Sequence, residues 1–141
     1  MAQKRTKLVV DFDYDFILFG ISSSVKFYKL AWAINNQLDL HLVRDADHII
    51  EDKTACEQPF GMYTFRRESE GYKLYKNRSL SGENVYLLPE FIHFDYLLKT
   101  EVSLQSFSAQ EMIKELKEIK WIEYIADLQV NTLKSRDNFL S

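Results

Sequence analysis

The spacing of apolar residues changes several times along the chain, and this change most constrains the fold. Two stretches place apolar side chains three or four positions apart, as an amphipathic helix does. These side chains are Phe27, Ala31, Ile34 and Leu38 in the first stretch, and Met112, Ile113, Leu116 and Ile119 in the second. Elsewhere apolar and polar residues mostly alternate, which is typical of half-buried strands. We therefore predict an α+β fold, with helices at about 24–38 and 109–120 on one face of a largely antiparallel sheet.

The alternating stretches predict the strands of this sheet. They cover residues 7–22, 61–67, 72–77, 91–101 and 121–128, with shorter strands near 40–42, 49–50 and 85–88. Segments 61–67 and 72–77 form a hairpin joined by 68–71, and residues 51–58 form a loop ended by Pro59. The stretch 7–22 is either one strand or two strands separated by a turn near Asp13. The strand–helix–strand order over 91–128 is compatible with a βαβ crossover, which would be right-handed.

Polar residues predict where the helices begin. Ser22, Ser23 and Ser24 are candidate N-caps for the first helix, and Ser108 with Glu111 has the spacing of a capping box for the second. Pro89 interrupts the apolar run before the strand at 91–101, in which alternate apolar residues are expected on one face. These residues are Ile92, Phe94, Tyr96 and Leu98.

The length of 141 residues suits one domain, and we expect the mostly polar segment 129–141 to be a loosely packed tail. The net charge of −3 argues against extensive nucleic-acid binding but allows a local basic patch. The single cysteine, Cys56, excludes an internal disulfide and fits a reducing compartment, so we predict a cytoplasmic protein. Asp11, Asp13 and Asp15 interrupt the apolar run that a signal peptide needs, and no run is long enough to span a membrane.

Two segments resemble a known family. Residues 88–96, LPEFIHFDY, are similar to the motif that gives the bacterial IPExxxVDY family its name, with Pro89, Glu90, Asp95 and Tyr96 identical and apolar exchanges at Leu88 and Phe94. Residues 28–35, YKLAWAIN, resemble the helix of that family that carries Tyr28, Trp32 and Asn35, with Lys29 in place of arginine. The resemblance implies a family but no activity. A lysine at position 29 cannot bind a carboxylate through two parallel hydrogen bonds, as arginine can.

The acidic residues of the first motif suggest a third and least favoured hypothesis, a metal-dependent or acid–base enzyme around Glu90, His93 and Asp95. On a regular strand, Glu90 and Asp95 point to opposite faces, because they are five positions apart. A bulge after Pro89 would change that. His93 and Asp95 share a face, but two ligands do not make a metal site. The structural alternative is that Glu90 shapes the entry to the strand while Asp95 makes local hydrogen bonds.

Other sequence features resemble functional sites only in part. Asp11, Asp13 and Asp15 resemble the start of a calcium loop, but Phe16 and Ser22 stand where that loop needs Gly and Glu. No nucleophile elbow surrounds the three serines. No histidine close in sequence accompanies Cys56. We predict no catalytic residue, metal or cofactor.

The predicted hairpin and its flanks, residues 60–80, contain interleaved basic and aromatic residues. The basic residues are Arg66, Arg67, Lys73, Lys76 and Arg78, and they interleave with Tyr63, Phe65, Tyr72 and Tyr75. With Glu68 and Glu70 the local charge is +3, whereas residues 39–58 have six acids and two bases, a charge of −4. Cations beside aromatic platforms can bind RNA, but the same pattern describes a hairpin with one buried face.

The favoured hypothesis is a non-enzymatic cytoplasmic protein that binds a protein partner or a second copy of itself. It depends on the many aromatic residues and on the separation of basic and acidic segments. The alternative is an RNA-associated accessory protein that uses the hairpin. Neither hypothesis involves a membrane.

Overall fold

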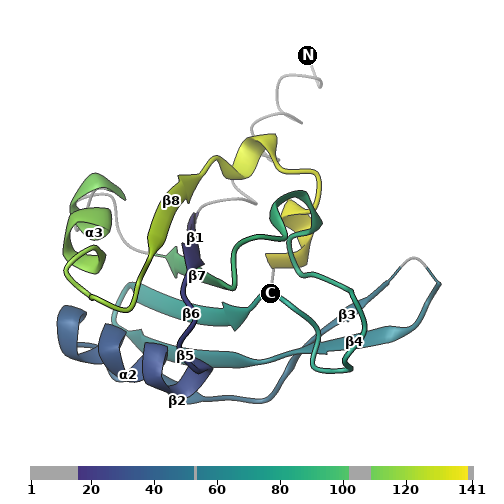
Figure 1. The fold of residues 1–141 in the computed structure, drawn as a ribbon, viewed down its shortest axis with the longest axis horizontal. Coiled ribbons are helices and arrows are strands. Elements are labelled where there is room, and N and C mark those ends of the chain that lie inside the picture. The colour runs from purple at the N-terminus through teal and green to yellow at the C-terminus, as the bar shows by residue number, and fades with distance from the viewer. Residues whose placement is uncertain (1–15, 53, 102–108, 140–141) are drawn as a thin grey trace.

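In the part of the chain that the structure describes, a six-stranded antiparallel sheet and two helices form the fold, as the computed structural model in Figure 1 shows. The structure describes residues 16–52, 54–101 and 109–139. The sheet has the order β2-β5-β6-β7-β1-β8, and β3 and β4 form a separate two-stranded sheet. The helices are α2 (Phe27–Leu38) and α3 (Ala109–Leu116). The strands are β1 (Ile17–Ser22), β2 (Val43–Arg44), β3 (His48–Glu51), β4 (Glu57–Phe60), β5 (Met62–Arg67), β6 (Glu70–Lys76), β7 (Tyr96–Glu101) and β8 (Tyr124–Leu128). The predicted α+β fold is confirmed.

In the sheet, strand β1 lies between β7 and β8. It pairs antiparallel with β7 on one side and with β8 on the other. Strands β7 and β8 are therefore parallel to each other, and α3 lies between them in the chain. The predicted strand–helix–strand unit is present, with β1 inserted between its two strands.

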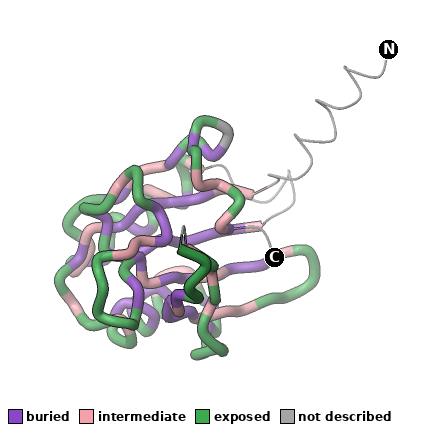
Figure 2. Tube along the Cα trace, turned by 90° about the vertical axis from the view of Figure 1, so that its right-hand side faces the viewer, coloured by how far each residue is buried: buried purple, intermediate pink, exposed green. Residues whose placement is uncertain are grey.

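Two hydrophobic cores lie on opposite faces of the sheet, because side chains alternate along each strand. On the first face, Phe19 and Leu98 pack with α2 and α3 through side chains such as Ile34 and Leu116. On the second face, Leu18, Tyr75 and Leu97 pack under the segment 87–94 and the C-terminal residues. Figure 2 shows buried residues concentrated inside the molecule and exposed residues in the outer loops. The sheet is thus covered on both faces, with both helices on one of them.

The C-terminal segment packs more closely than the sequence predicts. Two short 3₁₀-helices, η2 (Val130–Thr132) and η3 (Arg136–Phe139), place Val130, Leu133 and Phe139 in the second core. Phe139 is fully buried. The expectation of a loosely packed tail is therefore wrong for residues 130–139, because a few well-spaced apolar side chains anchor a segment that is polar on average.

The predicted helix starts and the entry to β7 also differ. Helix α2 begins after Lys26, with no side-chain cap, so the three serines do not cap it. Residues 91–95 are not a strand: Pro89 begins the 3₁₀-helix η1 (Pro89–Phe91), as its fixed φ allows. As a result Ile92 is exposed, Phe94 enters the second core and Tyr96 enters the first.

Several smaller predictions are also settled or lie outside the described residues. The hairpin 61–77 is confirmed, since β5 pairs with β6 as expected. Strand β4 occupies part of the segment predicted as a loop. Helix α3 ends at Leu116, and β8 begins only at Tyr124. The aspartates at 11, 13 and 15 and the capping serine at 108 lie outside the described residues. In the described part of the chain, no helix combines the length and apolar character needed to cross a membrane.

Candidate functional site

The side chain of Asn77 organises the segment 88–94. Its Oδ1 accepts a hydrogen bond from the Leu88 backbone N–H at 2.8 Å. Its Nδ2 donates to the carbonyls of Phe94 at 2.8 Å and Phe91 at 3.2 Å. Asn77 is only 1% exposed, so these bonds satisfy backbone groups that water cannot reach. The segment is thereby fixed as a compact turn rather than a strand.

Glu90 fastens the C-terminal segment to this turn. Its carboxylate accepts hydrogen bonds from the backbone N–H groups of Lys134 and Ser135 and from the Ser135 hydroxyl. Burial raises the pKa of Glu90, but the hydrogen bonds from Ser135 and Lys134 outweigh it, so the pKa lies below its usual value. Glu90 therefore binds the C-terminal segment, a contact that the predicted role at the entry to a strand did not include.

Asp95 and Tyr96 bind a different segment, the connection between β1 and α2. The Oδ2 of Asp95 accepts a hydrogen bond from the Ser23 N–H at 2.9 Å, and the Tyr96 hydroxyl donates to the Val25 carbonyl at 2.6 Å. Burial and the charge of Asp95 raise the pKa of Tyr96 to about 12. The Ser23 hydroxyl donates to the Trp121 carbonyl. This cluster joins β1, β7 and the approach to β8.

The acidic residues of the motif are thus engaged with separate parts of the chain. Glu90 binds residues 134–135, Asp95 binds Ser23, and the ring of His93 lies 4.3 Å from that of Phe94. Among the described residues, no group of three His, Cys, Asp or Glu side chains is arranged to hold a metal ion. These contacts hold the chain together, but they differ from the structural alternative, because Asp95 binds a distant residue, Ser23, and Glu90 binds the C-terminal segment.

The second motif divides into buried and exposed residues. Asn35 forms a pair of hydrogen bonds with the backbone of Leu42, as its Oδ1 accepts from the N–H at 2.8 Å and its Nδ2 donates to the carbonyl. This pair fixes the chain after α2. Tyr28 and Trp32, in contrast, are 57% and 62% exposed. Lys29 is exposed beside them, and its ammonium makes no ion pair with any described residue.

The five basic residues of the hairpin region do not form one patch. Alternation along β5 and β6 places Arg66 and Lys73 on the second face of the sheet. Arg67 reaches the end of α2 on the first face, where it donates to the Asp39 carbonyl. Lys76 lines another hollow together with Tyr96. The Tyr96 side chain belongs to the core on the first face of the sheet. Arg78 donates to the Asn84 side chain in a loop. The structure therefore brings Arg66 and Lys73 into one pocket, and Lys76 and Arg78 into a separate hollow.

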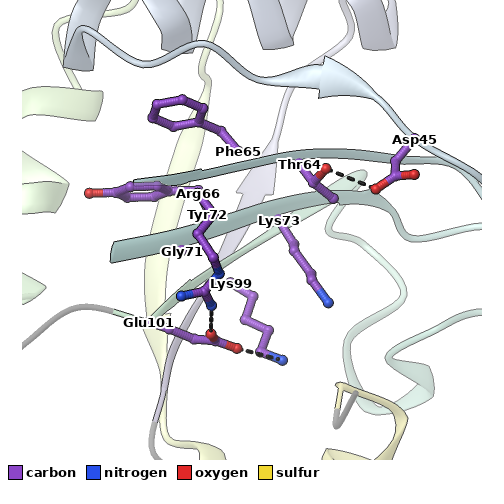
Figure 3. A pocket seen from close by; sticks show the side chains of 9 residues that line it. All are labelled: Asp45, Thr64, Phe65, Arg66, Gly71, Tyr72, Lys73, Lys99 and Glu101. Carbon is purple, nitrogen blue, oxygen red and sulfur yellow. Dashed lines mark hydrogen bonds and ion pairs between the residues drawn. The ribbon is translucent and has the colours of Figure 1, made fainter. Parts of the chain in front are cut away.

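This pocket lies on the second face of the sheet and has a volume of about 220 Å³ (Figure 3). Arg66 of β5, Lys73 of β6 and Lys99 of β7 line it together. The Glu101 carboxylate lies between two of these cations, 2.5 Å from Arg66 Nη2 and 3.2 Å from Lys99 Nζ. At the opposite end, Asp45 accepts a hydrogen bond from the Thr64 hydroxyl. The pocket therefore has three cations and two carboxylates.

Lys99 is the cation of this pocket that sequence reasoning missed. It is only 3% exposed. Its ammonium donates to the Phe139 carbonyl at 2.5 Å and lies 4.7 Å from the centre of the Phe16 ring. Burial lowers the pKa of Lys99; Glu101 acts in the opposite direction, but the net shift is downward. The one sequence signal was a lysine directly after two leucines in a predicted strand.

A larger hollow of about 850 Å³ lies between the β3–β4 hairpin and the segment 84–92. Its apolar lining includes Ile50, Phe60, Val85 and Ile92. The nearby Asp52 carboxylate is engaged by Thr54, Cys56 and Gln58, and these hydrogen bonds lower its pKa to about 2. The described lining of the hollow thus offers apolar surface, and its Asp52 carboxylate is already occupied by these hydrogen bonds.

Comparison with known proteins finds no family model and no curated protein that matches this chain. The resemblance to the IPExxxVDY family therefore stays a prediction based on residues 28–35 and 88–96.

Proposed function

We propose that this protein binds another protein through an aromatic surface formed by Tyr28, Trp32 and Trp121. The observation that carries the proposal is the exposure of Tyr28 and Trp32, which lie one helical turn apart on α2. The ring of Trp121 lies 6.4 Å from that of Trp32 and extends the surface beyond the helix. Tryptophan and tyrosine supply much of the binding energy at protein interfaces.

The fold does not require large aromatic side chains at these positions. The buried face of α2 is made by Leu30, Ala31, Ala33 and Ile34. Tyr28 and Trp32 lie outside that face and leave more than half of their surface in contact with water. A partner that covers them would remove this apolar area from water, at roughly 25 cal/mol per Å².

Charge indicates the chemistry of the partner. Lys26 and Lys29 are exposed at the start of α2, and the helix contains no acidic residue. Cations at a helix N-terminus oppose the helix dipole, so they do not serve the stability of α2. A partner segment with carboxylates beside apolar side chains complements this surface. Symmetric pairing of two copies would instead bring the two Lys29 side chains together, so we favour a different protein over self-association.

The alternative of RNA binding has less support. The basic residues of the hairpin are divided between two faces of the sheet, whereas a single strand of RNA is bound along a continuous basic groove. We propose the cytoplasm as the location, because the exposed thiol of Cys56 suits a reducing compartment.

The test compares capture of partners by the wild-type chain and by the Trp32→Ala variant. Each protein recovered by the wild type is purified and its binding is measured directly by calorimetry. We expect Trp32→Ala to weaken binding at least about tenfold, as loss of an interface tryptophan does, and Lys29→Glu to weaken it more at low salt than at high salt.

The matched control is Ile49→Ala, which removes an exposed apolar side chain from β3, outside the aromatic surface. This variant should bind as the wild type does. A partner that binds wild type and Trp32→Ala equally, or a recovered set consisting only of RNA, would contradict the proposal.

A further inference from the structure

We propose that the pocket between β5, β6 and β7 binds a small phosphate-type oxyanion, held by Arg66, Lys73 and Lys99. This inference is independent of the aromatic surface, since α2 packs on the first face of the sheet and the pocket lies on the second.

The register of the three strands brings the cations together in two neighbouring rows. In one row, Thr64 is opposite Lys73, and Lys73 is opposite Lys99. In the next row, Arg66 is opposite Gly71, and Gly71 is opposite Glu101. Figure 3 shows these side chains on the same side of the sheet. Two lysines directly opposite each other on adjacent strands repel. Glu101 lies beside Lys99 but is shared with Arg66, so a further anion would also be favoured.

Gly71 allows Arg66 to reach into this site. A Cβ at position 71 would stand 2.5 Å from Arg66 Nη2 and 3.2 Å from Glu101 Oε1. Without that Cβ, the guanidinium lies across β6 and reaches Glu101 on β7. The absence of a side chain at position 71 thus keeps a cation of β5 within the same pocket as Lys99.

The charges within the pocket favour an added anion. Glu101 is shared by Arg66 and Lys99, and Asp45 lies at the far end beside Thr64. Three cations against two carboxylates leave a net positive charge. Lys99 is buried, where charges interact more strongly than in water. An oxyanion between Lys73 and Lys99 would reduce their mutual repulsion and accept hydrogen bonds from both.

The size and geometry favour a small tetrahedral anion. The volume of about 220 Å³ is below the range of roughly 300–1,000 Å³ typical of sites for drug-sized ligands. The donors come from three strands, so they approach a bound group from different directions. Phosphate presents several strong acceptor oxygens and nearly two negative charges at neutral pH, which matches such an arrangement.

The experiment titrates inorganic phosphate into the full chain at constant ionic strength, set with sodium chloride, and follows backbone amide resonances by NMR. We expect saturable shifts centred on β5, β6 and β7. Lys73→Gln should weaken binding about tenfold or more, as should Arg66→Gln, because each removes a charge-assisted hydrogen bond. Glycerol phosphate serves as a second ligand. Binding of both ligands assigns the site to a phosphate group in general, and binding of inorganic phosphate alone assigns it to the free ion.

The matched control is Lys76→Gln, which removes a lysine of the same strand outside the pocket. It should leave phosphate affinity within about twofold of wild type. Spectra of the free variants establish that each is folded. Shifts no larger than those caused by chloride, or equal weakening by Lys73→Gln and Lys76→Gln, would overturn the proposal, as would binding of RNA but not of small phosphates.

Discussion

The ring of Phe94 lies directly against Gly20, so a Cβ at position 20 would stand 2.6 Å from the ring. Gly20 is in the middle of β1, and Phe94 is buried in the second core. The close approach joins the segment 88–96 to the centre of the sheet.

Gly20→Ala should therefore destabilise the fold. A methyl group at this position must displace the Phe94 ring, and such overpacking costs about 1–3 kcal/mol. The free energy of unfolding is measured by urea denaturation. Adding Phe94→Leu to Gly20→Ala should cost less than the sum of the two single changes, because the smaller side chain makes room. Strict additivity of the two changes would contradict the contact.

Asn77→Ala should cost about 3 kcal/mol, because it leaves the buried Leu88 N–H and the buried Phe94 carbonyl without their partner. The control is Asn36→Ala, where the exposed side chain donates to the Trp32 carbonyl at the surface of α2. That change should cost less than about 0.5 kcal/mol. Thermal and urea unfolding of both variants test the difference, and equal losses would show that Asn77 does not organise the turn.

Glu90→Gln should loosen the C-terminal segment without unfolding the sheet. The amides of Lys134 and Ser135 lose a charged acceptor, so their hydrogen exchange should accelerate while exchange in β6 and β7 remains slow. Because the carboxylate is largely exposed, the total cost should be about 1 kcal/mol or less. Unchanged exchange at both amides would contradict the role of Glu90.

The same carboxylate predicts a dependence on pH. The pKa of Glu90 in the folded protein lies below its ordinary value of 4.5. Its contribution to stability is therefore fully present above pH 4.5 and is lost as the pH falls below that value through the folded pKa. Stability measured between pH 7 and pH 3 should fall less steeply in Glu90→Gln than in wild type. Parallel curves would exclude this contribution.

Glu101→Gln should be more damaging than removal of both members of the Lys99–Glu101 pair. The single change leaves the buried ammonium of Lys99 without its carboxylate, and breaking such a pair costs about 3–5 kcal/mol when fully buried. Since Glu101 is partly exposed, we expect about 2 kcal/mol. The double variant Lys99→Met with Glu101→Gln should be closer to wild type, as a urea double-mutant cycle would show. A double variant as unstable as the sum of the single variants would contradict this coupling.

Local patterns predicted those parts of the fold that local interactions determine. The hairpin of β5 and β6 follows from two alternating stretches and a short turn, and α2 follows from the spacing of Phe27, Ala31 and Ile34. The segment 91–95 was mispredicted because Ile92, Phe94 and Tyr96 alternate as in a strand. The hydrogen bonds of Asn77, a residue distant in sequence, override that pattern.

The candidate site could be predicted only in part. Arg66 and Lys73 were identified as basic residues of a hairpin, but their grouping with Lys99 depends on the pairing of β6 with β7. A local pattern contains no information about which strands become neighbours. The exposure of Tyr28 and Trp32 was equally hidden, because large aromatic side chains are highly buried on average.

The position of β1 between β7 and β8 has a consequence for the order of assembly during synthesis. The ribosome makes β1 before its partners, which span Tyr96–Glu101 and Tyr124–Leu128. The apolar segment Ile17–Ile21 must therefore remain without its strand partners until those residues have been made. Pairing between segments so distant in sequence slows folding, and it leaves an unpaired apolar strand accessible to other chains. Nascent chains that stop before residue 124 should consequently be prone to aggregation, which a chaperone that binds extended apolar segments would suppress.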